Sequence, residues 1–232
     1  MEVSMAQASF SPDFFDFLRD LTQNNQRDWF QANKKRYEND VKDPALRFIS
    51  EVGPGLKKIS PQIQAIPKAV GGSMFRIYRD VRFSKDKSPY KTHVGLHFRH
   101  RQGKDAHAPG FYLHLAVGEV FVGTGIWHPS NPVLRQIRGA LMEDSKAWEA
   151  VRSDSKIAKH FEFAGESLKR PPRGIPADHP LIEDLKRKDF FVLAHLSEEE
   201  ALERDFQKRF LELCRAGRAL PAYLCKILDL PF

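Results

Sequence analysis

Residues 111–124, FYLHLAVGEVFVGT, set the fold class of this chain. Phe111, Leu113 and Leu115 alternate with less apolar residues, which is the period of a half-buried β-strand. A second apolar run begins at Val120, after a segment around Gly118 that is long enough only for a turn. The stretch therefore predicts two adjacent antiparallel strands, residues 111–117 and 120–124.

Similar short stretches on either side of this hairpin, rich in β-branched and aromatic residues, extend the predicted sheet. The gaps between most of them are too short for repeated helical crossovers, so we expect an antiparallel sheet of about four to five strands. A polar connection at residues 101–109 is expected to form a mobile hairpin loop. The further strands are predicted at residues 73–79, 94–100 and 190–194.

Helical patterns flank this sheet in the sequence. Ser11-Pro12-Asp13 is a typical helix start, and Ser197 with Glu200 predicts a capping box that opens a helix to about residue 215. Gly53-Pro54-Gly55 is expected to interrupt an earlier helix. The prediction is a single α+β domain over residues 10–232, with its sheet packed against N-terminal and C-terminal helices, after a flexible tail at residues 1–9.

Composition excludes several classes of protein. The chain has 232 residues, 41% of them hydrophobic, yet no apolar run approaches the ~20 residues of a membrane span. The start, MEVSMAQASF, lacks the basic and apolar regions of a secretory signal, and Cys214 and Cys225 do not form a CxxC pair. We expect a cytoplasmic protein without a membrane segment, metal or cofactor, of undetermined oligomeric state.

Positive charge is concentrated in one segment. Residues 76–104 hold nine Lys or Arg residues and two Asp residues, which accounts for the whole net charge of +7. Such a segment creates a local positive potential that attracts anions. The alternative is that Asp80 and Asp86 pair with the nearest cations, and that the remaining charges are solvated.

The predicted strands place polar and aromatic residues on one face of the sheet and apolar residues on the other. Arginine holds a phosphate or carboxylate through its planar fork, lysine adds a point charge, and histidine exchanges protons near neutral pH. The candidate ligand-binding residues on this face and in the following loop are Arg76, Arg79, Arg82, Lys87, Tyr90, Lys91, His97, Tyr112 and His114.

Three long motifs carry a family resemblance: FFDFLRDLTQNNQRDWFQANKKRYE, FRIYRDVRFSKDKSPYKTHVGLHFRH and GFYLHLAVGEVFVGTGIWHP. With them the chain resembles, from about residue 10 to its end, a widespread bacterial and fungal family known only as a conserved domain of unknown function. The resemblance implies a single family domain. It names no activity, cofactor or catalytic residue.

The residues favour a protein that binds a small anionic ligand, a phosphate ester or a carboxylate, in a basic cleft. His114 or Tyr90 would then transfer a proton. One alternative is a nucleic-acid-binding module that stacks bases on Tyr78 and Tyr112. Another is a non-catalytic interaction domain whose basic loop meets an acidic partner. The sequence does not decide between a binding protein and an enzyme.

Overall fold

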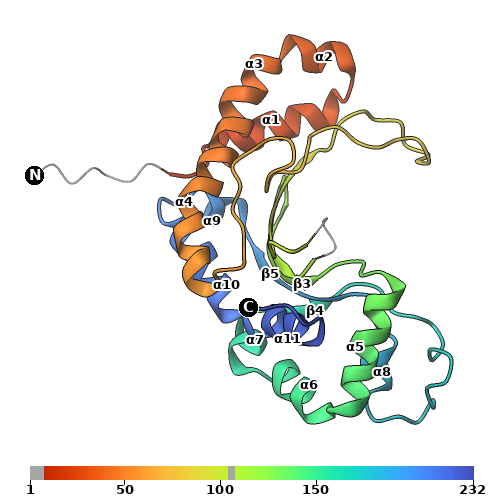
Figure 1. Ribbon diagram of the computed structural model, residues 1–232. Helices are drawn as coiled ribbons and strands as arrows, with labels where there is room; N and C mark the ends of the chain where they lie inside the picture. Colours follow the sequence, from red (N-terminus) through yellow and green to blue (C-terminus); the bar gives the residue numbers. More distant parts are fainter. Residues whose placement is uncertain (1–7, 104–107) are drawn as a thin grey trace, which may run out of the picture.

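The computed structural model describes residues 8–103 and 108–232. Five antiparallel strands form one sheet in the order β1-β2-β3-β5-β4, and Figure 1 shows this curved sheet between two groups of helices. The predicted α+β class and the antiparallel sheet are confirmed. The strands are β1 (His93–Arg99), β2 (Gly110–Ala116), β3 (Glu119–Ile126), β4 (Glu162–Ala164) and β5 (Phe190–Leu196).

Helices precede, interrupt and follow the sheet along the chain. The N-terminal group is α1 (Pro12–Gln23), α2 (Arg27–Ala32), α3 (Lys34–Arg36), the π-helical turn η1 (Tyr37–Lys42) and α4 (Asp43–Ile59). Between β3 and β5 lie α5 (Asn131–Glu143), α6 (Ser145–Arg152), α7 (Ser155–His160) and α8 (Ile182–Leu185). The C-terminal group is α9 (Glu198–Leu202), α10 (Phe206–Ala216) and α11 (Ala219–Ile227).

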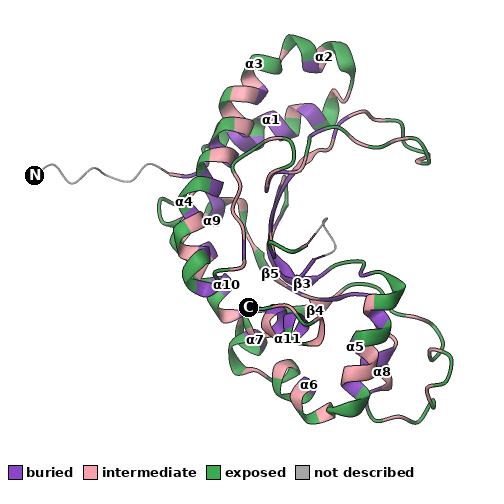
Figure 2. Cartoon of the chain, in the orientation of Figure 1, coloured by how far each residue is buried: buried purple, intermediate pink, exposed green. Residues whose placement is uncertain are grey.

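One face of the sheet packs on helices and forms the core. Leu96, Phe98 and Leu113 on this face are completely buried, and β1, β2 and β3 are buried over most of their length (Figure 2). The Phe98 ring centroid lies 5.4 Å from that of Phe210 in α10, which in turn lies 5.4 Å from that of Phe48 in α4. Because these rings contact one another, helices from both ends of the chain share one core. Burying each of these side chains contributes about 1.5–3 kcal/mol to the stability of the fold.

Helix α1 begins where the sequence predicts. Pro12 occupies the first turn, where its missing N–H costs no hydrogen bond, and Phe14, Phe17 and Leu18 are buried on one side of the helix. The helix ends at Gln23 and is capped by Asn24, whose backbone N–H donates to the Asp20 carbonyl. The turn that follows carries Asn25 toward the sheet edge.

The predicted interruption at Gly53-Pro54-Gly55 is wrong, because α4 continues to Ile59. Pro54 is on the exposed side of the helix, so its ring does not disturb the core. A Cβ at Gly55 would lie 2.4 Å from the Leu211 Cδ1 atom, which shows how closely α10 approaches here. Packing of α4 on α10 overrides the low helix propensity of these residues.

The predicted strand at residues 73–79 is also wrong, since this segment makes only isolated bridges at Met74 and Tyr78. Its first part pairs with β1, where the Phe75 N–H donates to the Gly95 carbonyl at 3.0 Å. Its second part turns to another partner, and the Arg79 N–H donates to the Pro89 carbonyl at 2.9 Å. The segment changes partner midway, so it does not form a continuous ladder.

Three smaller predictions also meet the structure. The capping box at Ser197 and Glu200 is confirmed, but the helix it opens ends at Leu202, and α10 begins separately at Phe206. Of the predicted tail, residues 1–7 lie outside the described residues, whereas Ser9 is buried. The predicted hairpin loop at 101–109 includes residues 104–107, which also lie outside them. Within the described ranges, no helix has the length and apolar character needed to cross a membrane.

Candidate functional site

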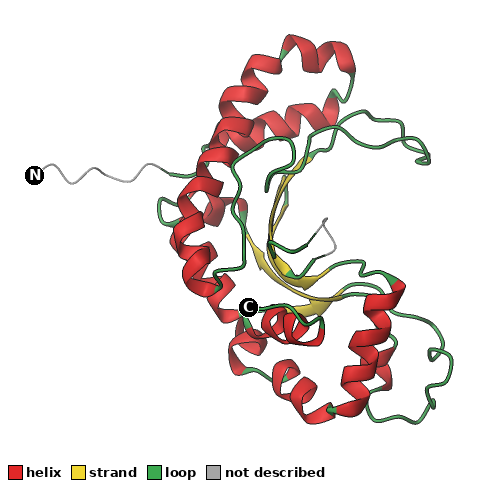
Figure 3. Ribbon diagram, viewed as in Figure 1, coloured by secondary structure: helices red, strands yellow, loops and turns green. Residues whose placement is uncertain are grey.

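Residues 79–89 form a projecting loop that connects residues 73–78 to the segment leading into β1, and this loop is here called the arm. At its base Tyr78 and Tyr90 form an antiparallel bridge, and the Lys91 N–H donates to the Ile77 carbonyl at 2.7 Å. Figure 3 draws the arm without helix or strand, and Figure 1 shows it extending away from the body of the molecule. The arm carries much of the positive charge that the sequence concentrates here.

Part of that charge is neutralised within the arm. The Nε and Nη2 atoms of Arg82 donate to the two carboxylate oxygens of Asp80, at 2.9 and 2.7 Å, and Arg79 pairs with Asp86. Arg82 lowers the pKa of Asp80 to about 2. Bonds from Ser88 and then from Arg79 lower the pKa of the Asp86 carboxyl well below its usual range. These pairs are exposed to solvent, where ion pairs contribute little and exchange partners readily.

A hollow of about 440 Å³ opens at the base of the arm, against the end of α1. The Asn25 side chain connects the end of α1, on one side of the hollow, to Tyr90 on the other. The amide N–H of Asn25 donates to the Tyr90 carbonyl at 3.0 Å, and the amide oxygen accepts from the Tyr90 N–H at 3.1 Å. The lining residues are Thr22, Asn25, Arg79, Asp86, Ser88, Tyr90, Lys91, Thr92 and His93.

Lys91 is the partly buried cation of this hollow. Its ammonium donates to the Arg76 carbonyl at 3.0 Å and lies 5.4 Å from the centroid of the Phe75 ring. Burial, and then the charge of Arg76, lowers the pKa of Lys91. An ammonium has three donors, so two N–H groups remain for a ligand after the bond to the carbonyl.

His93 connects the hollow to a row of rings on the open face of the sheet. Its ring centroid lies 4.5 Å from that of His114, which stacks on Phe121 at 4.6 Å. The Tyr112 hydroxyl lies 3.1 Å from His114 Nδ1, within hydrogen-bond range, and Glu119 lies 3.8 Å from Nε2. Burial is the largest cause that lowers the pKa of both histidines to about 4, so both are neutral at pH 7.

The structure separates the nine predicted ligand-binding residues into groups. Three of them, Arg79, Tyr90 and Lys91, line the hollow. Tyr90 is itself buried, with its ring stacked on Phe30, and contributes to the wall rather than an exposed hydroxyl. Arg82 and Lys87 lie farther out, on the exposed part of the arm.

The remaining four residues lie beside the hollow or on the sheet. Arg76 supplies the carbonyl that holds Lys91. His97, Tyr112 and His114 share the open face as predicted, but all three are largely covered. Phe75 contributes to this cover, with its ring centroid 6.2 Å from that of Tyr112.

The nucleic-acid alternative expected Tyr78 and Tyr112 on one flat face. Tyr112 lies over the sheet against Phe75, whereas Tyr78 packs on Tyr90 and Phe30 at the base of the arm. The two tyrosines therefore belong to different ring clusters.

Six of the nine lining residues were not among the predicted site residues, and His93 and Asn25 are two of these six. His93 has the same strand parity as His97, so the alternation that placed His97 on the open face also applies to it. Asn25 lies 65 residues before its partner Tyr90, and no local sequence pattern indicates such a contact.

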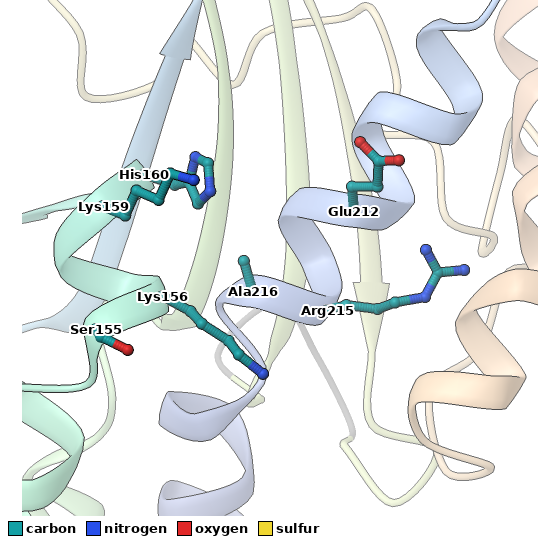
Figure 4. A pocket seen from close by; sticks show the side chains of 7 residues that line it. All are labelled: Ser155, Lys156, Lys159, His160, Glu212, Arg215 and Ala216. Carbon is teal, nitrogen blue, oxygen red and sulfur yellow. The ribbon is translucent and has the colours of Figure 1, made fainter.

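Across the described parts of the chain, no three His, Cys, Asp or Glu side chains come close enough together to hold a metal ion. A second hollow, of about 430 Å³, lies between α7 and α10. Figure 4 shows Glu212 and Arg215 extending from α10 away from α7, so the charged groups there do not point to one place. The hollow at the base of the arm is therefore the stronger candidate site.

A sequence model of the conserved hypothetical protein family DUF2461 matches residues 13–223. The chain belongs to the DUF2461 family. The DUF2461 match includes both walls of the hollow, from Thr22 in α1 to His93 in β1. No curated protein and no solved structure matches the chain.

Proposed function

We propose that this protein binds a small anionic ligand, bearing a phosphate or a carboxylate, in the hollow at the base of the arm. The observation that supports the proposal most is that Arg79, at the start of the arm, and Lys91, just after its end, line one hollow together with the polar side chains of Asn25 and Ser88. An arginine fork and a lysine ammonium, with neutral donors beside them, suit a phosphate or carboxylate group.

The charges of the hollow favour an anion by a small margin. Arg79 and Lys91 are positive, Asp86 is negative, and His93 is neutral at pH 7. The Asp86 side chain is 59% exposed, so an incoming anion displaces it from Arg79 at little cost. Lys91 forms no ion pair with a carboxylate among residues 8–103 and 108–232, and it is the cation available to a ligand.

His93 gives the proposed site a proton acceptor. An anion bound beside the imidazole favours its charged form and raises the pKa from about 4 toward neutrality. Binding a dianion would therefore take up a proton at mildly acidic pH. The His114 ring packs against His93, and the Tyr112 hydroxyl lies within hydrogen-bond range of His114.

Thermal unfolding with added anions tests this proposal. The melting temperature is measured in phosphate, a nucleotide and a dicarboxylate, each against potassium chloride of the same ionic strength. A ligand present at ten times its Kd stabilises the protein by about 1.4 kcal/mol, which is about 3–5 °C for a chain of this size. Lys91→Met should abolish the shift.

Lys87→Met is the matched control, because Lys87 carries the same charge four residues before Lys91 but does not line the hollow. It should keep the shift of the unaltered protein. Equal losses in the two variants, or no anion exceeding chloride, would refute the proposed site.

A further inference from the structure

The tip of the arm exposes an aromatic ring. The Phe83 side chain is 95% exposed, whereas most phenylalanines of this chain are buried in the core. The adjacent Arg82 guanidinium lies 5.8 Å from the centroid of this ring. Burial of a phenylalanine side chain stabilises a fold by about 1.5–3 kcal/mol, and the exposed Phe83 side chain does not contribute this free energy.

The arm holds this ring in a defined place. The Lys87 ammonium donates to the Val81 carbonyl at 2.9 Å, and the Ser84 N–H donates to the same carbonyl at 3.3 Å. On the returning limb, the Ser88 N–H and hydroxyl both donate to Asp86, at 2.9 and 2.6 Å. The loop is closed by its own hydrogen bonds, so the exposure of Phe83 is built into its conformation.

The arm combines this ring with exposed positive charge. Its two acids, Asp80 and Asp86, are both engaged by the arginines of the arm. Tyr78, at the base, is a second aromatic residue with half of its surface exposed. The exposed cations along this segment are Arg76, Arg82, Lys85 and Lys87.

We infer that the arm binds single-stranded nucleic acid, with one base stacked on Phe83 and the neighbouring phosphates on the exposed cations. Exposed rings interleaved with arginine and lysine suit a single strand, because its bases are free to stack and its backbone is uniformly negative. A membrane surface would require several apolar side chains at one level, and the arm tip presents a single large one. The inference does not depend on the anion site in the hollow.

Fluorescence anisotropy with a labelled oligothymidylate of fifteen nucleotides, and with the corresponding oligouridylate, tests the inference. The unaltered protein should bind at 50 mM potassium chloride and weaken steeply at 200 mM, because phosphate contacts release counterions. Phe83→Ala should weaken binding by about tenfold, the effect of losing one stacked base. Phe83 is exposed, so this variant should keep the circular dichroism spectrum and melting temperature of the unaltered chain.

Trp127→Ala is the matched control, since Trp127 is another exposed aromatic residue, at the end of β3. It should change the affinity by less than about twofold. Lys91→Met separates this inference from the anion site, because it should remove the melting shift in phosphate while leaving oligonucleotide binding nearly intact.

Three results would overturn the inference. The first is no binding of either oligonucleotide at 50 mM salt. The second is equal affinity of Phe83→Ala and the unaltered protein. The third is that vesicles of phosphatidylserine and phosphatidylcholine, rather than oligonucleotides, lose their binding in Phe83→Ala, which would assign the arm to a membrane surface.

Discussion

Asp189 is a buried carboxylate that joins two loops beside the end of β3. Only 1% of it is exposed, and its two oxygens accept from the backbone N–H groups of His128 and Glu166, at 2.8 and 2.9 Å. His128 has a φ of 45°, in the left-handed region that non-glycine residues avoid. The carboxylate stabilises this turn by satisfying its amide group.

We expect Asp189→Ala to lower the free energy of unfolding by about 3 kcal/mol, because two buried N–H groups lose a charged partner. Asp189→Asn should cost less, since its amide oxygen still accepts one bond. Urea denaturation measures both changes. Glu183→Ala is the control, because the Glu183 side chain is 78% exposed, and its effect should stay within about 0.5 kcal/mol. An effect of Asp189→Ala as small as this would contradict the assigned role.

The histidines beside the hollow make stability depend on pH. In the folded protein, burial lowers the pKa of His93 and His114 to about 4, below the ordinary value of 6.5 that applies to the unfolded chain. Between these values the unfolded chain binds more protons, so stability is complete above pH 6.5 and falls as the pH drops toward 4. Asp and Glu carboxyls contribute further losses at the acidic end of this range.

We expect His114→Gln to flatten the dependence of the urea midpoint on pH between 6.5 and 4.5. Lys91, Arg79 and Glu119 also act on the pKa of His93, so part of the slope should remain in this variant. The direct check is the NMR titration of the imidazole protons in the unaltered chain. Titration of both histidines near pH 6.5 would contradict the account.

Among the strands, β3 depends on a glycine at its close approach to β5. Gly125 has a φ of 127°, and a Cβ there would lie 2.2 Å from the Phe190 carbonyl oxygen and 2.7 Å from the Phe191 Cα. Both atoms belong to the backbone, so the strands must move apart to admit a side chain. Gly139 in α5 differs, because a Cβ there meets no atom within 4 Å.

We expect Gly125→Ala to destabilise the protein by more than about 2 kcal/mol, because it combines an unfavourable φ with a backbone clash. Gly139→Ala should instead stabilise it by up to about 1 kcal/mol, since alanine favours the helix and restricts the unfolded chain. Thermal and urea unfolding of the pair measure both signs. Similar effects of the two substitutions would show that the β3–β5 approach is looser than described.

Elements that depend on local pattern could be predicted from the sequence. The hairpin of β2 and β3 follows from alternation and one short turn, and α1 follows from Ser11, Pro12 and its apolar stripe. The continuation of α4 past Pro54 could not be predicted, because it depends on contact with Leu211, more than 150 residues away. The pairing of residues 73–79 first with Gly95 and then with Pro89 depends on the path of the chain after residue 79, which the alternation within this segment does not indicate.

The candidate site could be predicted only in part, because local patterns indicate its residues but long-range contacts determine its position. Charge concentration indicated the segment that contains Arg79 and Lys91, and strand parity indicated the face with His97 and His114. The position of the hollow depends on Asn25 reaching Tyr90 across 65 residues, which no sequence pattern reports. The sequence thus indicated the kind of side chains, and tertiary contacts determine which of them meet.

For the molecule as a whole, the shared core leads us to expect one cooperative unfolding transition. The main hydrophobic cluster runs from Phe10 to Leu224 and joins both helical groups to the sheet. Trp29 packs against it near the N-terminus, and Trp148 is completely buried in α6. In each of two variants that retain one of these tryptophans, with the other two replaced by Phe, the urea curve by fluorescence should coincide with the curve of the same variant by circular dichroism. Separated midpoints within one variant, relative to its circular dichroism, would indicate two independent domains.

Anomalous diffraction from crystals soaked in sodium tungstate locates a bound oxyanion most directly. We expect a peak in the hollow, within about 4 Å of the Lys91 ammonium and the Arg79 guanidinium, and its absence from crystals of Lys91→Met. Lys87→Met crystals should keep it. A tungstate found only on the outside of the arm, beside Arg82 and Lys87, or at no position in the hollow, would contradict the proposed anion site.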